Sequence, residues 1–124
     1  MSDRELLELA AKAAGTKIYE STDGTIQNRP VWVFKAGGGM GTMPYEERWN
    51  PLRDDSQALR LAVKLRLTVE QWFWGQEALV YDFRESTIHE GLGVSVHEPY
   101  GTDPLAATRR AIVRAAAEIG RNMP

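Results

Sequence analysis

The sequence predicts an α/β fold of the α+β kind: a three-layer α/β/α sandwich with three helices and a mostly antiparallel sheet of four or five strands. Three segments, near residues 2–15, 54–65 and 103–120, combine a helix cap with the apolar spacing of an amphipathic helix. Two others have the pattern of β-hairpins, which pair their strands antiparallel. The predicted order is α-β-β-α-β-β-β-α, in a single domain spanning residues 1–124.

The composition is that of an ordinary globular domain. Hydrophobic residues make up 43% of the 124 residues and charged residues 26%, and a chain of this length can bury a core unaided. It contains no cysteine, which excludes disulfides and thiolate metal sites. The formal charge of -2 gives no general attraction to nucleic acid. No apolar run approaches the roughly 20 residues that span a bilayer. We therefore expect a soluble, cytoplasmic protein that contacts no membrane and needs no cofactor.

The first helix and the first hairpin follow from local signals. Ser2 and Glu5 fit a capping box, and Gly15 is a left-handed stop. Asp23-Gly24 then joins two β-prone segments, because both residues tolerate positive φ. The glycine-rich stretch from Gly37 to Arg48 has no periodicity and predicts a loop.

The second helix begins at an Asp54 cap, and Ser56, Gln57, Arg60 and Lys64 form its narrow solvent-facing stripe. A hairpin turning near Gly75-Gln76 and a strand near residues 92–98 come next. The last helix starts at an Asp103 cap and is predicted to end at Gly120.

Two segments, WNPLRDDSQALRLAVKLRL and DPLAATRRAIVRAAAEIGR, resemble small proteins grouped as the phage ABA sandwich domain family. Members of that family show a W-N-P ahead of a D-D-x-x-A-L-x-L-A helix, an alanine-rich last helix and a short amphipathic first helix. The resemblance implies a three-layer sandwich, a phage or prophage origin, and hence the cytoplasm of a bacterial host. It implies no catalytic residue. The segments from Gly37 to Arg48 and after Phe83 depart from the family pattern.

The candidate binding residues are Trp49, Asn50, Tyr45, Arg110 and Arg114. An exposed Trp49 beside Asn50 would stack on a base or a planar ligand, but a turn that leads into the second helix is the favoured interpretation, because Pro51 excludes helical geometry at the residue before it. Arg110 and Arg114 fall on the outward face of the last helix, where Glu118 is placed to pair with Arg114. They form either a solvated face or a small basic patch.

The sequence gives no specific signal for catalysis or metal binding. His89 and His97 are each followed by a glutamate, but neighbours on a strand point to opposite faces. A metal site needs more ligands than two distant histidines. The glycines at 37–39 lack the Lys-Ser/Thr of a phosphate-binding loop.

The leading hypothesis is a non-enzymatic phage accessory protein that binds a host or phage protein. Trp32, Trp72 and Trp74 would form its contact surface if they are exposed, and an uncovered edge strand would pair two copies into a homodimer. The alternative is a nucleic-acid-binding module that uses the arginine-bearing helix with Trp49 or Tyr45. A third hypothesis is a small-ligand binder or enzyme that uses the glycine-rich loop.

Overall fold

The computed structural model describes residues 1–21, 31–36, 45–82 and 93–124. In this part of the chain three helices and six strands alternate as helix, three strands, helix, three strands, helix, which is an α+β fold. The helices are α1 (Asp3–Ala14), α2 (Asp55–Lys64) and α3 (Pro104–Arg121). The strands are β1 (Tyr19–Ser21), β2 (Val31–Ala36), β3 (Tyr45–Arg48), β4 (Leu67–Trp72), β5 (Glu77–Asp82) and β6 (Ser95–Pro99).

The described strands form two separate antiparallel sheets, with the orders β1-β2-β3 and β4-β5-β6. The antiparallel pairing is as predicted, whereas the prediction of one sheet of four or five strands is wrong. The additional strand is β3, in a segment predicted to be a loop. It is held by β2, from Ala36 opposite Tyr45 to Val33 opposite Arg48. Its sequence has no apolar alternation, so it carries no strand signal of its own.

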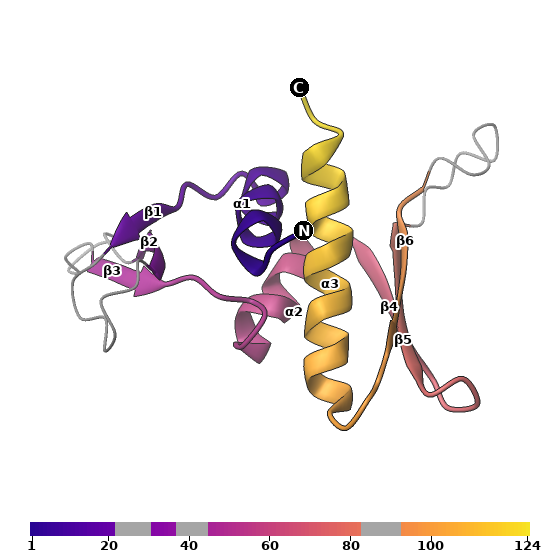
Figure 1. Cartoon of the computed structure of the whole chain (residues 1–124). Helices are drawn as coiled ribbons and strands as arrows, with labels where there is room; N and C mark the ends of the chain where they lie inside the picture. The colour runs from indigo at the N-terminus through magenta and orange to yellow at the C-terminus, as the bar shows by residue number, and fades with distance from the viewer. Residues whose placement is uncertain (22–30, 37–44, 83–92) are drawn as a thin grey trace.

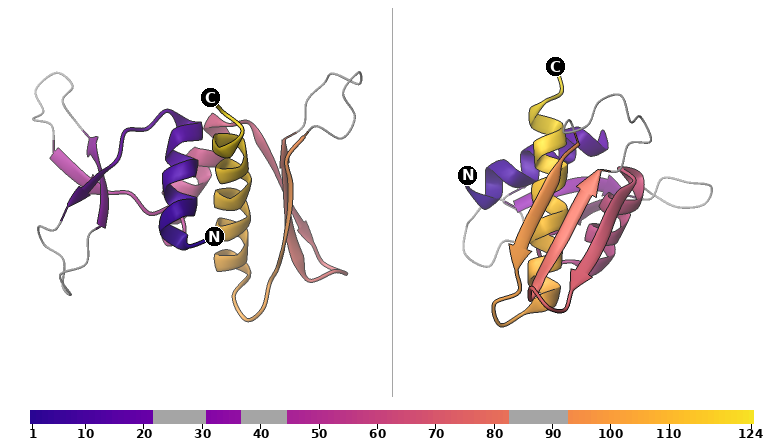
Figure 2. Two further views of the ribbon diagram at one scale, coloured as in Figure 1. Left: turned by 45° about the horizontal axis from the view of Figure 1, so that its top comes forward. Right: turned by 90° about the vertical axis from the view of Figure 1, so that its right-hand side faces the viewer.

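The layers are stacked differently from the prediction. Figures 1 and 2 show α3 in the middle, with α1 and α2 on one side of it and the β4–β6 sheet on the other. The β1–β3 sheet lies beyond α1 and α2 (Figure 1). The described helices therefore lie between two sheets, which corrects the expected sandwich of helices on both faces of one sheet. In the right-hand view of Figure 2 the outer face of the β4–β6 sheet is turned toward the reader, and no described helix covers it.

The composition of α3 explains this stacking. Small side chains on both of its sides allow α1 to approach from one direction and the sheet from the other. On the sheet, Ala78 and Val80 of β5 and Val96 of β6 are buried in the same core. Because the side chains of a strand alternate, the opposite face of the sheet carries mainly polar and aromatic residues around Leu79. The buried residues of α3 are Ala107, Ala111, Ile112, Val113, Ala115, Ala116, Ala117 and Gly120.

Gly120 marks a close approach of α1 and α3. A Cβ atom built at this residue would overlap the carbonyl oxygen of Leu9 and lie 2.9 Å from its carbonyl carbon. The prediction that Gly120 ends the helix is wrong, because α3 continues through Arg121 to a cap at Asn122. Glycine is required here because the α1 backbone occupies the place of a side chain.

The three predicted helix starts are confirmed. At each start the cap residue is extended, and its side-chain oxygen accepts a backbone N–H three residues further on. Gly15 ends α1 with a φ of 67°. The second hairpin also turns where predicted, with Gln76 at a φ of 52°. The cap bonds run from Glu5 to Ser2 (3.2 Å), from Gln57 to Asp54 (3.0 Å) and from Ala106 to Asp103 (3.1 Å).

The buried side of α2 differs from the prediction. Leu59 and Val63 are 64% and 69% exposed. Gln57, which helical spacing predicts on the solvent-facing stripe, is buried with a relative exposure of 8%. The helix therefore presents apolar side chains to solvent and a polar one to the interior. This polar side chain hydrogen-bonds the backbone of the turn before the helix.

Candidate functional site

The Trp49-Asn50-Pro51 triplet forms the turn that leads into α2. Trp49 and Pro51 are buried, and Trp49 belongs to the central core. The Oδ1 atom of Asn50 accepts the N–H of Leu52 at 3.2 Å, the local bond of an Asn-initiated turn. The structure agrees with the interpretation of the triplet as a turn into the helix. A binding role for Trp49 and Asn50 stays a prediction.

Gln57 holds this turn in place from within α2. Its Nε2 donates to the carbonyl of Arg48 at 2.6 Å, and its Oε1 accepts the N–H of Asn50 at 2.6 Å. One buried amide thus satisfies a backbone group on each side of Trp49, and both groups would be costly to leave unpaired away from water. The only sequence signal for this role is the spacing Asp54-x-x-Gln57, which resembles a capping box.

Arg110 and Arg114 tie α3 to its neighbours. Arg110 donates from both terminal nitrogens to Oδ1 of Asp3 at 3.2 Å. Arg114 donates to Oε2 of Glu98 at 2.5 Å, so its carboxylate partner lies on β6 and is not Glu118, which the i, i+4 spacing predicts. One arginine therefore connects α3 with α1 and the other connects it with the sheet.

Arg109, which the sequence did not single out as a binding residue, is the most buried of these three arginines. Its side chain is 17% exposed and its NH1 atom lies 2.6 Å from Oδ1 of Asp55. Its Nε also donates to the carbonyl of Leu52 at 2.8 Å. Arg109 thus joins α3 to the start of α2 through a charged and a backbone acceptor, in a fork geometry that lysine cannot reproduce.

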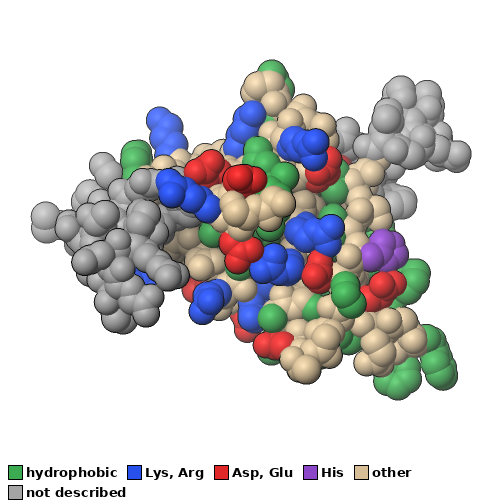
Figure 3. All heavy atoms as spheres, viewed as in Figure 1, with side chains coloured by type: hydrophobic (Ala, Val, Ile, Leu, Met, Phe, Trp, Pro, Cys, Tyr) green, Lys and Arg blue, Asp and Glu red, His purple; other side chains and the backbone are tan. Residues whose placement is uncertain are grey.

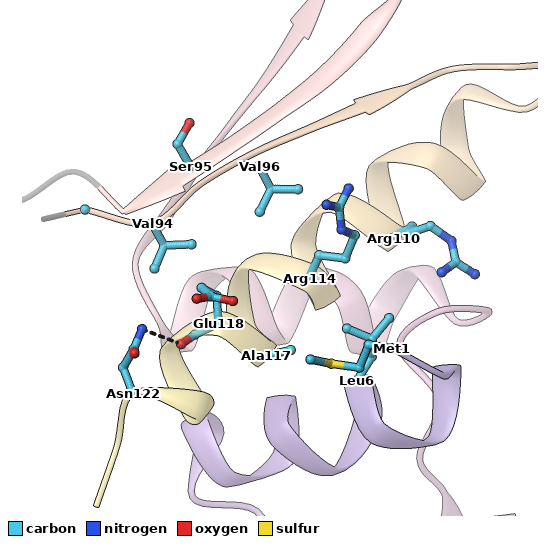
Figure 4. Close-up of a pocket in the computed structure, with 11 residues that line it drawn as sticks. Met1, Leu6, Val94, Ser95, Val96, Arg110, Arg114, Ala117, Glu118 and Asn122 are labelled. Carbon is cyan, nitrogen blue, oxygen red and sulfur yellow. Dashed lines mark hydrogen bonds between the residues drawn. The ribbon is translucent and has the colours of Figure 1, made fainter. Parts of the chain in front are cut away.

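The two predicted arginines lie together in the wall of a cavity of about 600 Å³ between the start of α1, β6 and α3. Figure 4 shows Val94 and Val96 facing α3 across this cavity, with Arg114 and Glu118 on the helix side. Both arginines are already paired with carboxylates, and Glu118 adds a further carboxylate to the wall. An anionic ligand would have to displace one of these carboxylates, so the cavity offers no ready anion site.

Other candidates are placed only in part. Tyr45 begins β3, and its side chain lies outside the described residues. The glycines at 37–39 and His89 also lie outside them. His97 is exposed on the outer face of the β4–β6 sheet, whereas Glu98 points inward to α3, so their predicted divergence is confirmed. Among the residues that the structure describes, no group of three or more His, Cys, Asp or Glu is arranged to hold a metal ion.

The end of the β4–β5 hairpin carries three consecutive exposed aromatic residues, Trp72, Phe73 and Trp74, which we call the aromatic tip. Their relative exposures are 43%, 74% and 94%. The rings of Phe73 and Trp74 meet edge to face, with centroids 5.5 Å apart. Figure 3 shows hydrophobic side chains projecting at the lower right, where this hairpin lies in Figure 1. Clustered exposed aromatic side chains of this kind typically mark an interaction site.

A hydrogen-bonded network covers the outer face of the sheet beside the aromatic tip. Glu70 accepts from Nε1 of Trp72 at 3.0 Å and from the hydroxyl of Tyr81 at 2.9 Å. The ring of His97 meets that of Trp72 edge-on, with centroids 5.7 Å apart. The Nδ1 atom of His97 lies 3.0 Å from Oε1 of Glu77. Trp72 is therefore held from two sides, while Phe73 and Trp74 project beyond it.

This network fixes negative charge next to the aromatic tip. The hydrogen bonds from Trp72 and Tyr81 lower the pKa of Glu70 below its ordinary value. The same bond to a carboxylate raises the pKa of Tyr81. At neutral pH Glu70 is consequently ionised and Tyr81 is neutral, so neither is poised to exchange a proton near pH 7. The pair is suited to orienting Trp72 and to presenting a carboxylate.

A second, smaller cavity of about 150 Å³ lies beside α2, and we call it the α2 pocket. Its apolar lining includes Phe34 from β2, Trp49 from the turn and Leu61 from α2. Arg60 and Lys64 also line it, and both are exposed. Neither has an ion-pair partner within the described part of the chain. The sequence did not indicate this pocket, because its lining comes from segments far apart along the chain.

None of the described helices is both long and apolar enough to cross a membrane. Comparison of the chain with known protein families, with characterised proteins and with solved structures finds no match in any of the three. The resemblance to the phage ABA sandwich domain family therefore stays a prediction.

Proposed function

We propose that this chain is a non-enzymatic interaction protein that binds another protein through its aromatic tip. The observation that carries the proposal is the exposure of Trp74 and Phe73, 94% and 74%, on a hairpin that projects from the sheet. Burying one large apolar side chain in a complex contributes about 1.5–3 kcal/mol. Tryptophan is also among the commonest residues at interface hot spots. The phage resemblance makes a host or phage protein the proposed partner.

The charges beside the aromatic tip narrow the chemistry of this partner. Glu70 and Glu77 lie on the outer face of the sheet, on the two strands of the same hairpin. Complementary charges at the rim of an interface guide the diffusional encounter of two proteins and disfavour wrong partners. The partner surface should therefore offer an apolar hollow with lysine or arginine beside it. The same carboxylates repel a nucleic-acid backbone at this face.

The test is affinity capture with the tagged protein from nuclease-treated bacterial lysates, prepared from infected and from uninfected cells. The informative variant is Trp74→Ala, and the matched control is Leu59→Ala, which removes a 64% exposed apolar side chain from α2. We expect Trp74→Ala to lose the partner and Leu59→Ala to keep it. A hot-spot loss of about 2 kcal/mol corresponds to a roughly 30-fold weaker Kd. Equal capture by all three proteins, with unchanged melting temperatures, contradicts the proposal.

Nucleic-acid binding through Arg110 and Arg114 is the second proposal, supported by the position of both arginines on one side of α3. Their ion pairs with Asp3 and Glu98 weaken it. It predicts retention on DNA that falls steeply with salt and is lost when both arginines are changed to glutamate. If the double variant is still retained on DNA, this role is rejected. Arg121→Glu on the same helix is the charge-reversal control.

A further inference from the structure

We propose that the aromatic tip of one copy inserts into the α2 pocket of a second copy, so that the protein associates with itself head to tail. This inference goes beyond the proposed function. It involves the aromatic tip that is offered to a foreign partner, but it adds a receptor surface, the α2 pocket, on the protein itself.

The α2 pocket has the size and lining that an aromatic ring requires. An apolar cavity of about 150 Å³ is large enough to take up benzene, and the α2 pocket has a volume of about 150 Å³. Phe34, Trp49 and Leu61 give it aromatic and aliphatic walls. One ring of the aromatic tip fills such a space. The second ring, held edge to face at a centroid distance of 5.5 Å, covers the opening.

The charges at the two surfaces are complementary. Arg60 and Lys64 are exposed in the lining of the α2 pocket and have no ion-pair partner within the described residues. The strands that carry the aromatic tip present Glu70 and Glu77. Insertion brings these two cations toward two carboxylates, and it also places the cations beside aromatic rings, which attract them. Apolar and ionic complementarity therefore favour the same occupant.

The arrangement of the fold makes the contact intermolecular. Figure 1 shows the β4–β5 hairpin projecting on the sheet side of α3, whereas α2 and β2 lie on the opposite side. A tip therefore cannot reach the α2 pocket of its own chain. Each contact leaves one tip and one pocket free, which is the geometry of a heterologous interface. Such interfaces produce rings or open chains.

The experiment uses the full chain and two variants with complementary defects. Phe73→Ala combined with Trp74→Ala removes the tip and leaves the pocket intact. Thr16→Trp fills the pocket from its rim and leaves the tip intact; Thr16 lines the pocket and is only partly buried. Circular dichroism and thermal melting check that each variant is folded. Sedimentation velocity over a wide concentration range then measures the wild type, each variant alone and their equimolar mixture.

We expect the wild type to form dimers and larger species as its concentration rises, and each variant alone to stay monomeric. The mixture should form a heterodimer and nothing larger, because it contains one working tip and one working pocket. If Thr16→Trp does not fold, the combined variant Arg60→Glu and Lys64→Glu replaces it, and Arg121→Glu is the charge-reversal control. The combined variant should weaken self-association several-fold more at low salt than at high salt.

A wild type that is monomeric throughout overturns the inference, and so does a mixture that stays monomeric although the wild type associates. Failure here is distinguishable from failure of the proposed function. The pocket variants keep the aromatic tip, so they still capture a foreign partner if one exists.

Discussion

Replacing Gly120 by alanine tests the packing of α1 against α3. The added Cβ overlaps the carbonyl oxygen of Leu9, and it lies 3.3 Å from the backbone nitrogen of Ala13. Both obstacles are backbone atoms, so relief requires a shift of one helix against the other. A separation of up to 1 Å forfeits about a quarter to a half of each contact's dispersion energy, and overpacking typically costs about 1–3 kcal/mol. The higher helix propensity of alanine returns about 1 kcal/mol.

The expected net effect of Gly120→Ala is a loss of about 2 kcal/mol in the free energy of unfolding, since the rigid obstacles place the steric cost at its upper end. In a domain of this size that lowers the melting temperature by roughly 8 °C. Urea denaturation followed by far-ultraviolet circular dichroism measures the change. Native-state hydrogen exchange should show faster exchange in α1.

The matched control is Gly15→Ala, where φ is 67° and no atom lies within 4 Å of the added Cβ. It costs about 1–2 kcal/mol through left-handed strain alone and should leave the exchange of the α1 interior unchanged. A Gly120→Ala variant as stable as the wild type, or more stable, would refute the reasoning. Helix propensity alone predicts that opposite result.

Three further predictions concern hydrogen-bonded side chains. Gln57→Leu leaves two buried backbone groups unpaired and should lower the free energy of unfolding by about 2–4 kcal/mol; a loss within error in urea denaturation would contradict its bridging role. Arg109→Ala removes a side chain that is 17% exposed and should cost about 1–3 kcal/mol. Arg110→Ala removes a more exposed side chain and should cost less than about 1 kcal/mol; equal losses would show that burial of the arginine does not matter. The lowered pKa of Glu70 contributes stability that is fully present above its ordinary value and is lost as the pH falls through the lowered pKa. Denaturation at a series of acidic pH values should therefore show a flatter profile for Glu70→Gln, and an unchanged profile would count against the contribution of Glu70.

The features that could be predicted from the sequence are those whose causes lie within a few residues. Each helix cap joins two residues three positions apart, and the turn of the second hairpin depends on its own backbone. β3 could not be predicted, because a neighbouring strand supplies its hydrogen bonds. The role of Gly120 depends equally on a distant partner, since Leu9 belongs to the first helix.

The same difference between local and distant causes holds for the candidate site. The sequence marked Trp72 and Trp74 as aromatic residues on a hairpin, but their exposure depends on α3 packing against the other face of the sheet. Arg110 and Arg114, predicted on the outward face of the last helix, are 39% and 44% exposed and reach α1 and β6. Their carboxylate partners lie 107 and 16 residues away in sequence, so helical spacing could not reveal them. The α2 pocket depends on four separate segments and left no signal in any of them.

The central position of α3 has a consequence for how the protein forms during translation. α1, α2 and the β4–β6 sheet all pack on α3, yet α3 follows every one of them in the chain. Until the ribosome has released α3, the earlier elements lack the surface that joins them. The elements made before α3 should therefore stay open to proteases and to chaperones until α3 has emerged, and the core should then close in one step.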